Sequence, residues 1–132
     1  MVEGVKILLV DDNEWELFLH QELFSMDKVD CELLPFTSAN DALNYLQLHD
    51  NNSNQYLILS DLNMPGMNGF EFLDNIKKLS YDLQERIKFF LISSTLNYYE
   101  VKKAKSTPGI QEFYSKPFVV SDFTRHIPAY AI

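Results

Sequence analysis

Short apolar runs alternate along this chain with segments of helical periodicity, and this alternation limits the possible folds more than any other feature. The runs occupy Val5–Val10, Tyr56–Ser60, Phe89–Ile92 and, more briefly, Glu112–Ser115. Strands that alternate with helical patterns are typical of a parallel sheet covered by helices, whereas grouped strands would indicate separate layers. We therefore predict an α/β fold built from five strand–helix units in one domain, residues 1–132.

The second strand fixes the order of the predicted sheet. We place this strand at Cys31–Thr37, where Pro35 favours an edge position because proline cannot donate to a strand ladder. An edge position for the second strand fits a flavodoxin-like doubly wound sheet of five parallel strands in the order 2-1-3-4-5. The first strand, Val5–Val10, is followed by a helix over Glu14–Met26, with Asn13 as its N-cap.

Turn and capping residues place the remaining elements. Ser38 is expected to cap a second helix, which ends in a polar loop, and Pro128 should end or kink the last helix. The other predicted elements are a loop over His49–Asn54, a helix from Phe70 to about Leu79, a strand at Lys88–Ser93, a helix over about Tyr98–Lys105 and a last helix from about Ser121.

Composition and charge exclude several classes of function. The 132 residues are 46% hydrophobic and 23% charged, which is typical of an ordinary globular domain. A net charge of -8 without a basic cluster argues against binding to nucleic acid or to anionic membranes. The sequence shows no targeting segment and no apolar run of about 18 residues, so we expect a cytoplasmic protein. The single cysteine, Cys31, is expected to be a core or half-buried thiol.

Polar side chains follow the predicted strands at the point where each strand ends. Asp11 and Asp12 follow the first strand, Asp61 follows the third, Ser93 ends the fourth and Lys116 follows the fifth. The carboxyl ends of parallel strands meet at one edge of the sheet, where open α/β folds bind their ligands. We therefore expect three acids, one hydroxyl and one ammonium to share a pocket.

A divalent cation is the simplest partner for carboxylates held this close together. Mg²⁺ binds through one or two carboxylates, waters and a phosphate group, so we predict that Asp11, Asp12 and Asp61 bind Mg²⁺. An aspartate beside such an ion can attack phosphorus and form an acyl phosphate. Lys116 and Ser93 would then hold the phosphoryl oxygens.

These motifs resemble the receiver domain of response regulators in two-component signalling, in its stand-alone, single-domain form. The resemblance covers nearly all of residues 5–127 and rests on Asp11-Asp12, the run Asp61–Gly69, Ser93 and Lys116-Pro117-Phe118. It implies a single receiver domain without an output domain. It also implies that the protein is not an enzyme, since it would catalyse only its own phosphorylation and dephosphorylation.

The resemblance also implies a role for each site residue. Asp61 would be phosphorylated by a histidine kinase or a phosphotransfer protein. Mg²⁺ would be held by Asp12, Asp61 and the backbone carbonyl of Asn63, and by Asp11 through water. Ser93 would bond the phosphoryl group and Lys116 would pair with it. Phe113 would be an aromatic rotamer switch, the Lys116-Pro117 bond would be cis, and an unknown downstream protein would bind one state better.

Three other functions remain open from the sequence. The chain could be a degenerate receiver that acts as a phosphorylation-independent scaffold. It could also be a phosphatase with an aspartyl nucleophile, although Asn63 is neutral where such enzymes have a second acid. A flavodoxin-like cofactor binder would need a phosphate-binding loop after the first strand, where Asp11 and Asp12 would repel the phosphate.

The histidines and the tryptophan receive separate expectations. His20, His49 and His126 show no trustworthy metal-binding spacing, so we expect each at the surface or at an interface. Trp15 lies three residues beyond Asp12 and is expected to be partly exposed near the mouth of the pocket.

Overall fold

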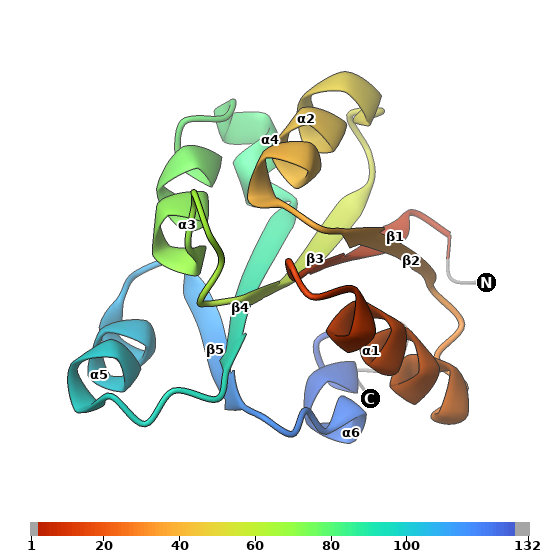
Figure 1. Cartoon of the computed structure of the whole chain (residues 1–132). Helices are drawn as coiled ribbons and strands as arrows, with labels where there is room; N and C mark the ends of the chain where they lie inside the picture. Colours follow the sequence, from red (N-terminus) through yellow and green to blue (C-terminus); the bar gives the residue numbers. More distant parts are fainter. Residues whose placement is uncertain (1–2, 129–132) are drawn as a thin grey trace.

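A computed structural model describes residues 3–128 and shows an α/β fold with one five-stranded parallel sheet (Figure 1). The strand order is β2-β1-β3-β4-β5, as predicted. The edge position of Pro35 is confirmed, since β2 pairs only with β1. The strands are β1 (Val5–Val10), β2 (Glu32–Phe36), β3 (Gln55–Asp61), β4 (Ile87–Ser93) and β5 (Ile110–Ser115).

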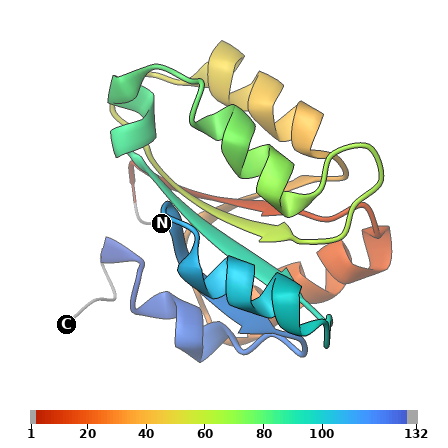
Figure 2. The same ribbon diagram turned by 90° about the vertical axis from the view of Figure 1, so that its left-hand side faces the viewer.

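Helices cover both faces of the sheet, so each face has its own apolar core. Helices α1 and α6 pack on one face, while α2, α3, α4 and α5 contribute buried residues to the core on the other. Figure 2 shows α2 and α3 lying side by side above the sheet. The helices are α1 (Glu14–Met26), α2 (Ala39–His49), α3 (Gly69–Ile76), α4 (Tyr81–Glu85), α5 (Tyr98–Ser106) and α6 (Val120–Thr124).

Strand β1 shows why the sheet needs cover on both sides. Its side chains alternate between the two cores, with Ile7 and Leu9 on the side of α1 and Leu8 and Val10 on the side of α2. All four are at most 1% exposed. A strand buried on both faces reads as a continuous apolar run, which is the pattern expected of a central strand in a parallel sheet.

Three helices begin with an asparagine N-cap. The side chains of Asn13, Asn68 and Asn97 accept backbone N–H bonds at the start of α1, α3 and α5. At Asn68 the bond is reciprocal, because Glu71 also accepts from the Asn68 backbone N–H. The predicted caps Asn13 and Ser38 are confirmed.

Two predicted helix ends were wrong. Helix α3 stops at Ile76 and does not reach Leu79, and the short helix α4, capped by the Ser80 side chain, follows before β4. Helix α6 stops at Thr124, before Pro128. Its last turn is closed by bonds from the N–H groups of His126 and Ile127 to carbonyls three residues earlier, a tightening common at helix ends. No described helix is long and apolar enough to cross a membrane.

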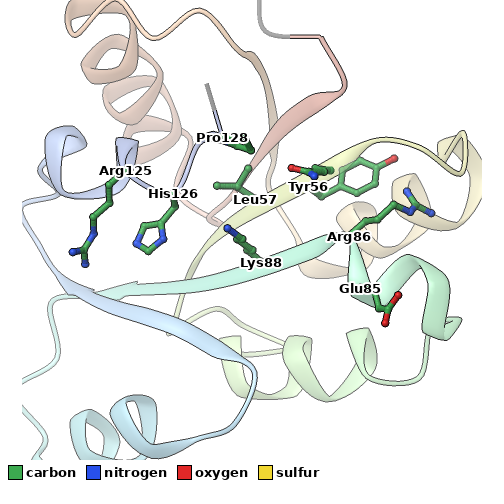
Figure 3. Close-up of a pocket in the computed structure, with 9 residues that line it drawn as sticks. Tyr56, Leu57, Glu85, Arg86, Lys88, Arg125, His126 and Pro128 are labelled. Atoms are coloured by element: carbon green, nitrogen blue, oxygen red, sulfur yellow. The ribbon is translucent and has the colours of Figure 1, made fainter. Parts of the chain in front are cut away.

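The edge of the sheet where the strands begin is held by an ion pair between Arg86 and Asp50. The two guanidinium Nη atoms of Arg86 donate to the two Asp50 carboxylate oxygens at 2.8 and 2.6 Å. The Tyr56 hydroxyl donates to Asp50 Oδ1 at 2.9 Å, and Arg86 also donates to the Asn54 carbonyl. In Figure 3 the Tyr56 and Arg86 side chains extend in the same direction beside a cavity at this edge. The Arg86 hydrogen bonds lower the pKa of Asp50 to about 2.

Candidate functional site

The opposite edge, where the strands end, brings the predicted acids and the lysine together. Lys116 Nζ lies 3.6 Å from Asp11 Oδ2 and 3.5 Å from Asp61 Oδ1. Asp11, Asp12 and Asp61 each offer a carboxylate oxygen, and these oxygens all lie within 4.8 Å of one another. Residues separated by 49 and by 55 positions in the sequence therefore form one cluster, as their places at the strand ends predicted.

Backbone hydrogen bonds between strands hold these positions in register. The Asp11 N–H donates to the Phe36 carbonyl of β2 at 3.1 Å, which extends the pairing of β1 by one residue. Beyond β3, the Leu62 N–H donates to the Ile92 carbonyl at 3.0 Å. The Lys116 N–H donates to the Ser93 carbonyl at 3.0 Å. This backbone hydrogen bond fixes Lys116 next to Ser93, directly after the last residue pair of β4 and β5.

Burial and repulsion raise the pKa values of two of the acids. Asp11 and Asp61 are buried, while Asp12 is exposed. Burial, followed by the charge of Asp11, raises the pKa of Asp61 to about 6 in spite of the Lys116 ammonium nearby. Burial also raises the pKa of Asp11. Burial acts to lower the pKa of Lys116, but the three carboxylates around its ammonium outweigh this effect and the pKa is raised.

The acid cluster fits a hard divalent cation. Asp11 Oδ2 is fully buried and has no hydrogen-bond partner among the described residues. Its nearest cation is the Lys116 ammonium at 3.6 Å, beyond hydrogen-bond distance, so this buried oxygen keeps a free position for a second cation. Two buried carboxylates and one exposed carboxylate, open to water, match the preference of Mg²⁺ for a few carboxylates with its remaining ligands from water and phosphate.

Ser93 lies at the end of β4, where its hydroxyl organises the following loop. Ser93 is 1% exposed. Its Oγ accepts the Thr95 backbone N–H at 3.0 Å and the Asn63 side-chain amide at 3.4 Å. The Asn63 contact brings the loop after β3 against the end of β4. Magnesium coordination by the Asn63 carbonyl stays a prediction.

Two features that the resemblance implied lie on β5 and directly after it. The Lys116-Pro117 peptide bond is cis, as predicted. Phe113 is half-buried and packs against the core on the side of α2, α3 and α5. A switch between rotamers of Phe113 stays a prediction.

The expectation for the histidines was wrong for His20. His49 is exposed, but His20 on α1 is only 4% exposed and lies edge-on to the Phe118 ring. His126 is half-buried, with its Nε2 2.7 Å from Glu112 Oε2. The polar character of histidine did not reveal that His20 is a buried residue of α1. Cys31 is buried, as predicted, and Trp15 is 77% exposed, which is more than the partial exposure expected.

Glu16 is a site residue that the sequence reasoning missed. Its Oε2 lies 3.6 Å from Lys116 Nζ, as close as the Asp11 carboxylate. The available signal was its place in the first turn of α1, four residues beyond Asp12, on the side that also carries His20. An acid in the first turn of a helix is so common that this signal alone would not have singled it out.

Comparison with known proteins now defines the class. The sequence model of the response regulator receiver domain matches residues 7–128. The chain therefore belongs to the response regulator receiver domain family of two-component signalling.

Individual relatives come from plants, amoebae and bacteria. The chain is 32% identical over 130 residues to the two-component response regulator ARR17 of Arabidopsis thaliana, covering 92% of this chain and 82% of that protein. It is 30% identical over 117 residues to the hybrid signal transduction histidine kinase C of Dictyostelium discoideum, and this match covers 86% of this chain and 9% of that protein. Among solved structures, a response regulator receiver protein from Dyadobacter fermentans has a TM-score of 0.84 at 26% identity, with 96% of this chain and 98% of that chain covered. A two-component response regulator from Cytophaga hutchinsonii has a TM-score of 0.82 at 27% identity, with 96% of each chain covered.

Proposed function

We propose that this receiver accepts a phosphoryl group on Asp61 from a histidine kinase or a phosphotransfer protein, and that the reaction depends on Mg²⁺. The observation that carries the proposal is the convergence of Asp11, Asp12, Asp61 and Lys116 at one edge of the sheet. Membership in the receiver domain family supports a histidine kinase as the source of the phosphoryl group.

The chemistry requires one bond to form as another breaks. A carboxylate oxygen of Asp61 attacks the phosphorus of a phosphohistidine, the new O–P bond forms, and the P–N bond breaks to release the imidazole. The Lys116 ammonium and the Ser93 hydroxyl would hold the phosphoryl oxygens. Asp11, Asp12, Asp61 and the Asn63 carbonyl would hold Mg²⁺, which, when bound, offsets the negative charge of the phosphoryl group.

The output would be a change of protein-binding surface. The added phosphoryl group carries roughly two negative charges. Ser93 would turn from the Thr95 N–H toward that group, the loop before α5 would follow, and Phe113 would move into the space left behind. The surface formed by α5, β5 and α6 would then differ between the two states, so a downstream protein would bind one state better. Hydrolysis of the acyl phosphate by water returns Asp61 and inorganic phosphate.

The decisive experiment measures the mass of the protein after incubation with acetyl phosphate, with and without Mg²⁺. We expect the wild type to gain one phosphoryl group only with Mg²⁺, and Asp61→Asn to gain none. Asp74→Asn, which alters an exposed acid of α3, is the matched control and should behave as the wild type.

Each contrary outcome indicates a different function. Absence of labelling in the wild type, with both Mg²⁺ and a phosphohistidine donor, would indicate a scaffold that works without phosphorylation. Labelling of Asp61→Asn would show that another residue accepts the phosphoryl group. Rapid multiple turnover of a generic phosphate ester would indicate a phosphatase.

A further inference from the structure

The ammonium of Lys116 has a third carboxylate neighbour that comes from a helix and not from a strand end. Lys116 Nζ lies 3.6 Å from Glu16 Oε2, 3.6 Å from Asp11 Oδ2 and 3.5 Å from Asp61 Oδ1. The Lys116 side chain is 19% exposed and the Glu16 side chain 32%. The resting lysine is therefore shared almost equally between the acceptor aspartate, its neighbour at the end of β1 and an acid of α1.

The Glu16 carboxylate also lies beside a buried histidine of the same helix. His20, one helical turn further along α1, has its Nε2 3.7 Å from the same Oε2 atom. The His20 ring is buried and packs edge-on against Phe118, two residues after Lys116, with ring centroids 5.6 Å apart. The side chain that Glu16 contacts and the loop that carries Lys116 thus belong to one packed unit.

This cluster does not need a second metal ion. Asp11, Glu16 and His20 each offer a ligand atom, and these atoms lie within 4.8 Å of one another, which would fit a metal. The Lys116 ammonium, however, already lies 3.6 Å from the Asp11 and Glu16 oxygens. Asp11 is shared with the cluster of Asp11, Asp12 and Asp61, to which the Mg²⁺ prediction applies. The Lys116 ammonium is thus the cation that the Glu16 carboxylate faces.

We propose that Glu16 is a positioning residue that competes with the incoming phosphoryl group for Lys116 and thereby slows the phosphorylation of Asp61. This inference rests on the function proposed above. A phosphoryl group arriving at Asp61 brings negative oxygens that need the ammonium, and Glu16 offers the ammonium an alternative partner. Glu16 also repels the same oxygens. Both effects lower the rate of transfer.

Removal of the Glu16 charge should speed the reaction. We expect Glu16→Gln to raise the second-order rate constant for phosphorylation by acetyl phosphate about fivefold, as a partly screened charge at this distance implies. Glu14→Gln is the matched control. Glu14 lies in the same first turn of α1 and is exposed, but it is not among the carboxylates paired with Lys116, so its loss should leave the rate near that of the wild type.

The experiment follows the mass of each protein over time at fixed Mg²⁺ and several concentrations of acetyl phosphate. Proton exchange of the ¹⁵N-labelled Lys116 ammonium, measured by NMR, reports the contact itself. It should be slow in the wild type and in Glu14→Gln, and faster in Glu16→Gln. Thermal unfolding verifies that all three proteins are folded, which the partial exposure of Glu16 favours.

The outcomes separate this inference from the proposed function. Equal rates in the wild type and in Glu16→Gln, with phosphorylation of both, would overturn the role of Glu16 and leave the proposed function intact. An equal increase in Glu14→Gln would also overturn it, because the effect would then be one of general charge. Unchanged ammonium exchange in Glu16→Gln would overturn the contact. A wild type that never gains a phosphoryl group would overturn the proposed function and this inference together.

Discussion

Asp61 occupies an environment that disfavours its own charge. It is 8% exposed and lies beside the buried Asp11, and its pKa is raised to about 6. Burial and the neighbouring Asp11 therefore disfavour the charged form of Asp61 in the folded state, a cost that the unfolded chain lacks. Lys116 offsets only part of it, because its charge is shared among three acids. The residue best placed to react is therefore also one that weakens the fold.

Neutralising Asp61 should stabilise the protein while ending its reaction. We expect Asp61→Asn to increase the free energy of unfolding by about 1 kcal/mol in the presence of a chelator at neutral pH, because the cost of burying the charge and the repulsion with Asp11 both disappear. Lys116 keeps Asp11 and Glu16 as partners in this variant. Urea unfolding of Asp61→Asn, compared with Asp74→Asn, measures the effect. A loss of stability would show that Asp61 is a net favourable partner of Lys116.

At the scale of single elements, the start of α3 depends on a glycine for close packing. Gly69 donates its N–H to the Leu62 carbonyl at 2.8 Å, which brings the helix directly against the end of β3. A Cβ at this position would lie 2.5 Å from Leu91 Cδ2 and 3.1 Å from the Asp61 carbonyl oxygen. Glycine is thus required by space, although its backbone angles are ordinary.

Gly69→Ala should destabilise the protein in spite of alanine's better helix propensity. The propensity gain is at most about 1 kcal/mol, whereas overpacking against a buried leucine and a backbone carbonyl costs about 1–3 kcal/mol. We expect a net loss of about 1 kcal/mol in urea unfolding and slower phosphorylation of Asp61, whose backbone the new methyl group touches. Asp74→Ala, on the exposed side of α3, controls for the helix. A more stable Gly69→Ala would mean that Leu91 changes rotamer at little cost.

The elements whose sequence signals are local were predictable, and those set by tertiary packing were not. The bounds of β1 and α1 follow from an apolar run, from the Asn13 cap and from helical spacing, and they agree with the structure. Helix α4 is only five residues long, which is too short for a helical periodicity to predict it. The end of α6 is set by turn bonds around His126. The burial of His20 depends on Phe118, which is distant in sequence.

The site was predictable to a similar extent for the same reason. Asp11, Asp12, Asp61 and Lys116 were found because parallel strands must end at one edge, which makes their convergence a property of topology. Glu16 was missed because its side chain reaches the cluster from a helix, and its direction depends on how α1 packs on the sheet. Sequence pattern fixes where strands end more firmly than how a helix is rotated.

At the scale of the whole molecule, the Arg86–Asp50 pair joins segments that are far apart in sequence. It connects the end of α2 to the start of β4, and through Asn54 and Tyr56 it also includes the beginning of β3. The Arg86 and Asp50 side chains are only 14% and 11% exposed. A bidentate pair with this degree of burial contributes more to the free energy of unfolding than an exposed ion pair does. The loss of one member leaves the other, largely buried, without its charged partner.

Arg86→Ala should lower the free energy of unfolding by about 2 kcal/mol at neutral pH. The folded-state pKa of Asp50, about 2, lies below its ordinary value of 3.8. Its contribution is therefore complete above the ordinary value and disappears as the pH falls toward the folded-state value. The stability difference between the wild type and Arg86→Ala should shrink over that interval, as measured by urea unfolding at several pH values. Lys88→Ala, an exposed change on β4, is the control. A difference independent of pH would show that packing of Arg86 matters more than its charge.

The two edges of the sheet thus differ in character: the edge where the strands begin adds stability, and the edge where they end carries the reactive acids. The clustered carboxylates lie where the strands end, the bidentate Arg86–Asp50 ion pair lies where they begin, and the apolar cores lie between them. The two ends can therefore vary separately over evolutionary time. A more stable ion pair at the beginning of the strands would therefore let the chain tolerate more destabilising substitutions in its acidic cluster before it ceased to fold.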